Sequence, residues 1–128
     1  MSWLKKTSDS LEASKSVAKV EWLALTDVLE LNLIVEKSSE IPILIFKHST
    51  RCGISRMVLR QFENEFNFHD KIKSYYLDLL QHRDISNEIA SRFDIKHQSP
   101  QVIVLKKGKV VYDASHESID ASKLKELV

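Results

Sequence analysis

The amino-acid sequence predicts an α/β protein, a three-layer sandwich in which helices cover both faces of a central mixed β-sheet. Three observations support this fold class. Strand-like and helix-like segments alternate along most of the chain. Residues Ile41–Phe46 are nearly all apolar, as expected of a central strand that is covered on both faces. Near the C-terminus, Lys106-Lys107-Gly108 separates two further strand-like stretches, which predicts a hairpin with its glycine in the turn.

Length and composition indicate a single globular domain. The chain has 128 residues, of which 43% are hydrophobic and 29% are charged, enough to bury a core without disulfides or metal. A formal net charge of +1 provides no basis for electrostatic binding of nucleic acid or of an anionic membrane. No apolar stretch approaches the roughly 18 residues that a membrane-spanning helix needs. The single cysteine, Cys52, cannot form an internal disulfide, and it favours a reducing, cytoplasmic setting.

The first half of the chain is expected to contain two strands and two helices after a leader. Residues 1–19 are rich in serine and lysine, and we expect them to form a flexible or loosely docked leader to a folded domain at 20–128. Alternation predicts a short strand at Val20–Leu25, and Thr26 suits the N-cap of a helix that runs to about Lys37. The central strand follows. After it, apolar residues at helical spacing predict a helix that begins at Cys52.

The second half adds three strands and two helices. They are expected at Lys71–Leu79 (strand), Asp84–Phe93 (helix), Gln101–Leu105 and Lys109–Tyr112 (hairpin), and Ile119–Val128 (amphipathic helix). The first strands need crossover connections and should be largely parallel, whereas the hairpin adds an antiparallel edge. The resulting order, βαβαβαββα, resembles that of the thioredoxin fold, in which the nucleophilic cysteine follows the second strand, where Cys52 lies.

The position of Cys52 favours a reactive thiol over an inert buried one. A cysteine at a helix N-terminus lies at the positive end of the helix dipole and can accept hydrogen bonds from the N–H groups of Ile54 and Ser55. The neighbouring Arg51 adds positive charge. Both effects favour the thiolate, which is the form that attacks disulfides. Without this context, a lone cysteine is more often a small buried apolar residue.

The segment Cys52-Gly53-Ile54-Ser55 has the spacing of a C-x-x-C redox motif, with serine in the second place. In a dithiol protein the second cysteine expels the substrate from the mixed disulfide, and a serine hydroxyl cannot do so. The sequence therefore predicts a monothiol mechanism that is resolved by an external thiol. Ser55 could hydrogen-bond the Cys52 sulfur, or it could be a first-turn serine that satisfies the backbone.

Ser99-Pro100 precedes an apolar strand. Proline here could mark only the start of the strand, with a trans bond. In thioredoxin folds a cis-proline stands opposite the cysteine, so we expect a cis Ser99-Pro100 bond and a Ser99 backbone that is free to pair with an extended substrate. His48 could tune Cys52, and His97 and His116 could line the same face, although each also fits a structural or solvated histidine. Their spacing fits no metal site.

Three stretches carry a family resemblance. They are Phe46-Lys47-His48-Ser49-Thr50-Arg51-Cys52-Gly53-Ile54-Ser55, Lys96-His97-Gln98-Ser99-Pro100-Gln101-Val102 and Ala114-Ser115-His116. They resemble, in order and separation, the signatures of the YtxJ-like family, thioredoxin-fold proteins of bacteria that use bacillithiol, described as monothiol bacilliredoxins. The likeness extends from about Trp22 to the C-terminus. Two positions depart from it: many relatives have proline at Gly53, and an aromatic residue often stands at Glu117.

The resemblance implies an oxidoreductase that removes bacillithiol from protein mixed disulfides through Cys52, with Thr50, Ser99 and Pro100 shaping the site. It implies no tightly bound cofactor, bacillithiol as the thiol co-substrate, and bacillithiolated proteins as partners. A low-molecular-weight thiol and a disulfide reductase would regenerate the protein. The alternative is a catalytically weak, stress-associated binding module with the same fold. Peroxide reduction through a Cys52 sulfenate is a weaker reading, because no resolving cysteine is present.

Overall fold

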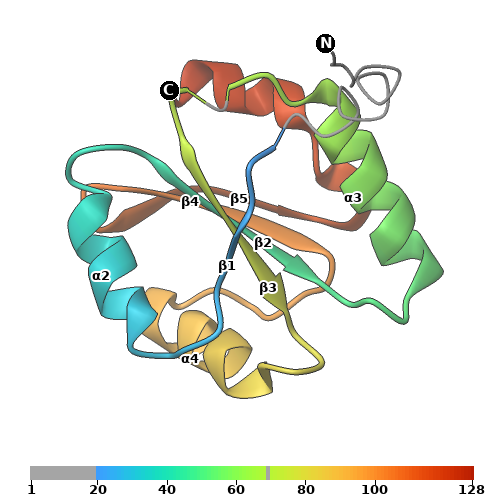
Figure 1. The fold of residues 1–128 in the computed structure, drawn as a ribbon, viewed down its shortest axis with the longest axis horizontal. Helices are drawn as coiled ribbons and strands as arrows, with labels where there is room; N and C mark the ends of the chain where they lie inside the picture. Colours follow the sequence, from blue (N-terminus) through green and yellow to red (C-terminus); the bar gives the residue numbers. More distant parts are fainter. Residues whose placement is uncertain (1–19, 69) are drawn as a thin grey trace, which may run out of the picture.

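The computed structural model describes residues 20–68 and 70–128, so the predicted leader at 1–19 lies outside the described residues. The elements follow one another in the predicted alternating order (Figure 1). They are β1 (Leu23–Ala24), α2 (Glu30–Lys37), β2 (Ile43–His48), α3 (Gly53–Glu65), β3 (Lys73–Asp78), α4 (Arg83–Phe93), β4 (Gln101–Lys106), β5 (Lys109–Ser115) and the short 3₁₀ helices η1 (His116–Ser118) and η2 (Ala121–Glu126). None of the described helices is both long enough and apolar enough to cross a membrane.

The five strands form one mixed sheet in the order β1-β3-β2-β4-β5, with β2 at its centre. Strand β3 runs parallel to both β1 and β2, as crossover connections require. Strand β4 is antiparallel to β2, and β5 is antiparallel to β4. The predicted mixed sheet, with parallel strands first and an antiparallel hairpin at one edge, is therefore confirmed.

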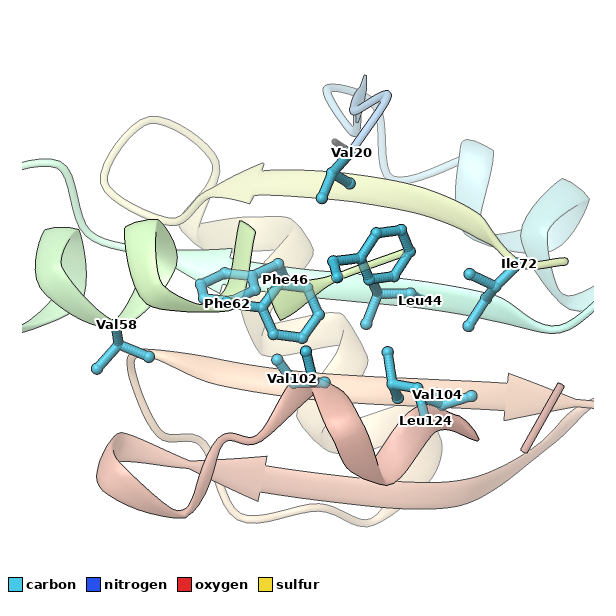
Figure 2. Packing of buried hydrophobic residues seen from close by; sticks show 11 residues of the cluster. Val20, Leu44, Phe46, Val58, Phe62, Ile72, Val102, Val104 and Leu124 are labelled. Carbon is cyan, nitrogen blue, oxygen red and sulfur yellow. The ribbon is translucent and has the colours of Figure 1, made fainter. Parts of the chain in front are cut away.

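Alternate residues of the central strand serve two separate cores. Leu44 and Phe46 pack against α3 and η2, where Phe46 and Phe62 meet edge to face with ring centroids 5.3 Å apart (Figure 2). Ile43 and Ile45 belong to a second buried cluster beneath α2 and α4. All six residues of β2 are buried, which confirms the prediction of a strand covered on both faces. The alternation follows from the two-residue repeat of a strand, and it produces the three layers seen in Figure 1.

The first strand and the first helix are shorter than predicted. Strand β1 contains only two residues, and α2 begins at Glu30 rather than after a Thr26 cap. The Glu30 carboxylate accepts hydrogen bonds from the N–H groups of Thr26 and Asp27, and Asp27 Oδ1 accepts one from the N–H of Leu29. These acidic side chains stabilise a turn in the segment that the sequence assigned to the helix, so the helix starts one turn later.

The predicted C-terminal α-helix over Ile119–Val128 is wrong, because the helix in this part of the chain is the 3₁₀ helix η2, which follows the shorter η1. Asp120 Oδ1 caps η2 by accepting from the N–H of Ser122. The buried side chains of η2 are Ala121 and Leu124, three residues apart. That spacing matches three residues per turn, so a 3₁₀ helix brings both side chains to the core cluster. Figure 2 shows Leu124 in that cluster.

The hairpin between β4 and β5 has the predicted turn. Lys107 and Gly108 both have positive φ angles, 53° and 78°, which is typical of a two-residue type I′ turn. Ser38, at the end of α2, hydrogen-bonds to both residues of this turn. Its carbonyl oxygen accepts from the N–H of Lys107 at 2.7 Å, and its hydroxyl accepts from the N–H of Gly108 at 2.8 Å.

Candidate functional site

The three stretches that carried the family resemblance meet at one end of the sheet. Strand register aligns Lys47 of β2 with Gln101 of β4, and Gln101 with Ser115 of β5. The loop to Cys52, the Pro100 segment and the segment after β5 therefore leave the sheet at the same end. The N–H of His116 donates to the carbonyl oxygen of Pro100 at 3.1 Å, which joins two of the three segments directly.

Cys52 is the N-cap residue of α3, and its side chain is half-buried. Its backbone is extended, with φ −99° and ψ 121°, and its carbonyl oxygen accepts the first helical hydrogen bond from the N–H of Arg56. Its thiol makes no capping hydrogen bond, so the predicted bonds from the N–H groups of Ile54 and Ser55 are not formed. Strong N-caps are oxygen-bearing side chains, whereas sulfur is a weak acceptor. Among the described residues, the thiol therefore lies at the positive end of α3 without a capping hydrogen bond.

Ser55 is fully buried and bonds to the end of β2. Its hydroxyl lies 2.8 Å from Nδ1 of His48 and accepts a hydrogen bond from the N–H of Ser49 at 3.1 Å. Of the two predicted roles, a bond to the Cys52 sulfur is not formed. The bond to a backbone group exists, but that group belongs to the strand end and not to the helix. Ser55 thus fastens the first turn of α3 to the central strand.

His48 lies on the α3 side of the sheet and is buried. Burial lowers the pKa of His48 below its ordinary value, the Asp78 carboxylate opposes this shift, and the Arg56 guanidinium adds to it. The neutral imidazole is therefore favoured, and Nδ1 can share one hydrogen with the Ser55 hydroxyl. His48 contacts the cysteine motif through Ser55, which is a structural role.

Lys47 points to the other side of the sheet and has no exposed surface. Its Nζ lies 2.9 Å from Nδ1 of His97. The hydroxyl of Ser86 in α4 lies 3.0 Å from the same atom, Nδ1 of His97. Burial lowers the pKa of Lys47 to about 8. Burial also lowers the pKa of His97, and the positive charges of Lys47 and Arg83 add to that effect. His97 therefore does not join His48 beside Cys52; it lies on the opposite face.

The bond between Ser99 and Pro100 is cis, as predicted. The segment is held by Gln101, whose Nε2 donates to the carbonyl oxygen of Lys96 at 3.1 Å. Two buried oxygens, Ser99 Oγ and Gln101 Oε1, have no hydrogen-bond partner in the structure. Within the described residues, the N–H and C=O of Ser99 also make no backbone hydrogen bond.

Two surface hollows flank the cysteine motif. One, of about 390 Å³, is lined by Thr50, Arg51, Asp78, Leu80 and Gln81. The other, of about 340 Å³, is lined by Ile54, Met57, Val58, Gln61, His116, Glu117 and Ile119. Ile54 and Met57 expose 59% of their surface each, which leaves apolar side chains directly after Cys52. Arg51 and His116 thus lie on opposite sides of the motif, and Glu117 adds an acid where the family often has an aromatic residue.

Sequence reasoning missed four polar residues at this end of the sheet. Lys47, Ser86 and Gln101 form the cluster on the α4 side, and Arg56 donates to the carbonyl oxygen of Thr50 at 3.0 Å. The signal for Lys47 was its place directly after an apolar run, in alternation with the inward Ile43 and Ile45. Gln101 stood in one of the stretches that carry the family resemblance, whereas nothing in the sequence marked Ser86 or Arg56. In the described residues, no three histidine, cysteine, aspartate or glutamate side chains form a group that could hold a metal ion.

Comparison with known proteins agrees with this geometry. The chain is similar to a solved structure described as a proposed oxidoreductase with a thioredoxin fold, with 30% identity, coverage of 88% of this chain and 94% of that chain, and a TM-score of 0.71. It also resembles thioredoxins of Malassezia sympodialis (20% identity, 87% and 90% coverage, TM-score 0.63) and Fasciola hepatica (18%, 81% and 93%, TM-score 0.61). At such low identity, the two thioredoxins establish the fold alone.

The family comparison is more specific. The model of the monothiol bacilliredoxin BrxC family matches residues 23–124, which include the cysteine motif, the Ser99-Pro100 segment and His116. The structure presents one thiol at the start of a helix and a buried serine in place of the second thiol. Both findings support a thiol–disulfide redox function. The chain therefore belongs to the monothiol bacilliredoxin (BrxC) family, and its fold is that of thioredoxin.

Proposed function

We propose that this protein removes bacillithiol from proteins that carry it as a mixed disulfide, with Cys52 as the nucleophile. The observation that carries the proposal is the pairing of a half-buried thiol at the start of α3 with a Ser55 that is buried and bonded to His48. Such a site can accept one thiol adduct and cannot resolve it internally. Membership of the bacilliredoxin family supports bacillithiol as that thiol.

In the first step, the Cys52 thiolate attacks the bacillithiol-side sulfur of the mixed disulfide. A disulfide forms between Cys52 and bacillithiol, the old sulfur–sulfur bond breaks, and the substrate cysteine leaves as a thiolate that takes a proton from water. In the second step, the thiolate of another bacillithiol molecule attacks the bacillithiol sulfur of the adduct. This step releases bacillithiol disulfide and restores the Cys52 thiolate, and a disulfide reductase then returns the disulfide to two thiols.

Three features of the site fit this chemistry. The end of the α3 dipole favours negative charge on Cys52. The unpaired N–H and C=O of Ser99 offer hydrogen bonds to an extended segment of the substrate protein. The hollow beside Arg51 offers a cation to the bacillithiol side of the disulfide. Free bacillithiol is a small thiol of reducing compartments, so the cytoplasm is the proposed location.

The test is transfer of bacillithiol from a single-cysteine protein to this chain, followed by intact-mass spectrometry. The wild type should gain one bacillithiol while the substrate loses one, and added bacillithiol should then clear the adduct. Cys52→Ser should show neither change. The matched control is the same substrate carrying glutathione, which reports the preference for one thiol over the other.

Three outcomes would overturn all or part of the proposal. If the substrate keeps its bacillithiol and no adduct forms on Cys52, the protein does not perform the reaction. Stable binding of the modified substrate without transfer would identify the alternative, a binding module with the same fold. Faster transfer from the glutathione form would retain the exchange chemistry and reject bacillithiol as the preferred thiol.

A further inference from the structure

We propose that Lys47 and His97 are positioning residues that hold the Ser99-Pro100 segment in place for substrate docking, from the face of the sheet opposite Cys52. This inference rests on the proposed exchange reaction, because it assigns the docking edge of that reaction. Neither residue touches the reacting sulfur atoms. Their contribution is the placement of the backbone that the substrate pairs with.

The segment before β4 is fixed at points on both sides of Ser99. On the N-terminal side, His97 Nδ1 lies within hydrogen-bond distance of Lys47 Nζ (2.9 Å) and Ser86 Oγ (3.0 Å), and Lys96 O accepts from Gln101. On the C-terminal side, the carbonyl oxygen of Pro100 accepts from the N–H of His116. Ser99 lies between these points with its N–H and C=O unpaired by the described backbone. The contacts therefore hold the segment on both sides of Ser99, whose backbone N–H and C=O remain available for pairing.

A role in core packing alone explains Lys47 poorly. The side chain is completely buried, and its hydrogen-bond partner in the described part of the chain is an uncharged imidazole nitrogen, not a carboxylate. A buried ammonium group without an opposite charge costs free energy, and an apolar residue of similar length would fill the same space at lower cost. The lysine differs from such a residue in one respect: it can donate a hydrogen bond to His97.

The contact depends on the protonation of His97. The neutral ring with its hydrogen on Nε2 offers one lone pair at Nδ1, which can accept from Lys47 Nζ or from the Ser86 hydroxyl, whereas the imidazolium has an N–H there. Protonation would then place two positive groups against each other and release the segment. The charged groups that face His97 are Lys47 from β2 and Arg83 from the start of α4, and both lower its pKa. Docking should accordingly be lost on acidification.

The experiment compares two reactions of the same variants. The first is exchange with a single-cysteine protein carrying bacillithiol or, in parallel, glutathione, measured as KM and kcat. The second is reaction with 5,5′-dithiobis(2-nitrobenzoate), a small disulfide that reports thiol reactivity without a protein docking edge. The variants are Lys47→Met, which keeps the length of the side chain, and His97→Ala. Lys109→Met, which alters an exposed lysine at the far end of the sheet, is the matched control.

Lys47→Met and His97→Ala should raise KM for the protein substrate about tenfold or more, because misplacement of a positioning group by about 1 Å can cost up to a hundredfold. Their reaction with the small disulfide should match that of the wild type, and Lys109→Met should change neither. His97→Gln, whose amide retains an acceptor, should recover most of the lost affinity. In the wild type, KM is expected to rise as the pH falls. His97→Gln should remove this rise, because glutamine does not titrate.

Thermal unfolding identifies any variant that fails to fold, and Lys47→Met should unfold at the same temperature as the wild type or higher. Wild-type KM values in folded Lys47→Met and His97→Ala would overturn the inference and leave the proposed function intact. Equal losses in both reactions would also overturn it, because the variants would then act on Cys52. Wild-type exchange with the glutathione form alone would reject the proposed function, while the same KM comparison would still decide the inference.

Discussion

Two consecutive residues of β2, Lys47 and His48, make polar contacts on opposite faces of the sheet. His48 reaches Ser55 and fastens the helix that begins after Cys52. Lys47 reaches His97 and fastens the segment that precedes Pro100. The central strand thus holds the helix of the proposed nucleophile from one face and the proposed docking segment from the other.

These two anchors, the His48–Ser55 pair and the Lys47–His97 pair, differ in their effect on the stability of the fold. The His48–Ser55 pair is favoured as a neutral pair, and the Ser55 hydroxyl also accepts a backbone N–H, so its buried polar atoms are well satisfied. Lys47 carries a charge into a fully buried position, and its pKa falls to about 8 as a result. A satisfied neutral pair stabilises the fold, whereas a buried charge lowers its stability. The comparison teaches that the anchor of the docking segment is maintained at the expense of stability.

The largest expected effect is a rise in stability at high pH. Because the folded-state pKa of Lys47 is about 8 and its ordinary value is 10.5, the unfolded chain binds more protons between these values. Stability therefore increases as the pH rises through this window, by up to about 3.5 kcal/mol at 1.4 kcal/mol per pKa unit.

Urea unfolding of the wild type and Lys47→Met at pH 7 and pH 10 measures this effect. Lys47→Met should be more stable at pH 7, and its advantage should shrink toward pH 10, while titrations common to both proteins cancel in the difference. An advantage that stays constant across this range would show that Lys47 does not titrate as a buried charge.

Loss of the His48–Ser55 pair should lower the stability of the fold, whereas removal of the Lys47 charge should raise it. In Ser55→Ala, Nδ1 of the buried His48 and the N–H of Ser49 lose their partner. Leaving such groups unsatisfied costs about 1–3 kcal/mol, so the unfolding midpoint in urea should fall. Ser91→Ala, at an exposed position in α4, should change stability by less than about 0.5 kcal/mol.

Ser55→Ala should also slow the reaction of Cys52 with a small disulfide, since the first turn of α3 is less firmly held. Lys47→Met should not. Equal stability of Ser55→Ala and the wild type would remove the distinction between the two anchors.

The smallest effect concerns Gly53, which takes part in neither anchor. Proline is favoured at the first position of a helix, and the extended backbone of Cys52 suits a residue that precedes proline. A Cβ atom at Gly53 would meet Nη2 of Arg56 at 3.9 Å, an ordinary contact. Gly53→Pro should therefore raise stability by about 0.4–1 kcal/mol through the unfolded chain. Calorimetry should show a higher Tm, with Gly53→Ala between the two; a lower Tm would mean that the helix start is not prepared for proline.

The sequence predicted the features that depend on strong local patterns. The apolar run before Cys52, the helix after it and the Lys107-Gly108 turn all appear in the structure. The cis Ser99-Pro100 bond could be predicted because the element order indicated which fold the chain adopts. The strand, the helix and the turn are each encoded within a few consecutive residues. The cis bond was predicted from the order of the helices and strands.

The remaining features depend on contacts between distant residues. Lys47 lay just outside the predicted strand Ile41–Phe46, and its burial depends on residues far along the chain, in α4 and the His97 segment. The Ser55 hydroxyl had two local roles to choose from, and its partner proved to be His48, seven residues earlier. The C-terminal segment was expected to be α-helical, yet the positions of Ala121 and Leu124 against the core favour the tighter 3₁₀ turn.

The outer strands of the sheet affect where another chain can add to it. An extended chain usually joins a sheet along an edge strand, which is also how sheets from different molecules aggregate. Here one edge, β1, has only two residues, and the other, β5, exposes Lys109 and Asp113 beside an irregular register at Val104/Leu105. Short, charged and irregular edges are poor templates for strand addition. The two edges of the described sheet therefore resist the addition of a strand from another molecule.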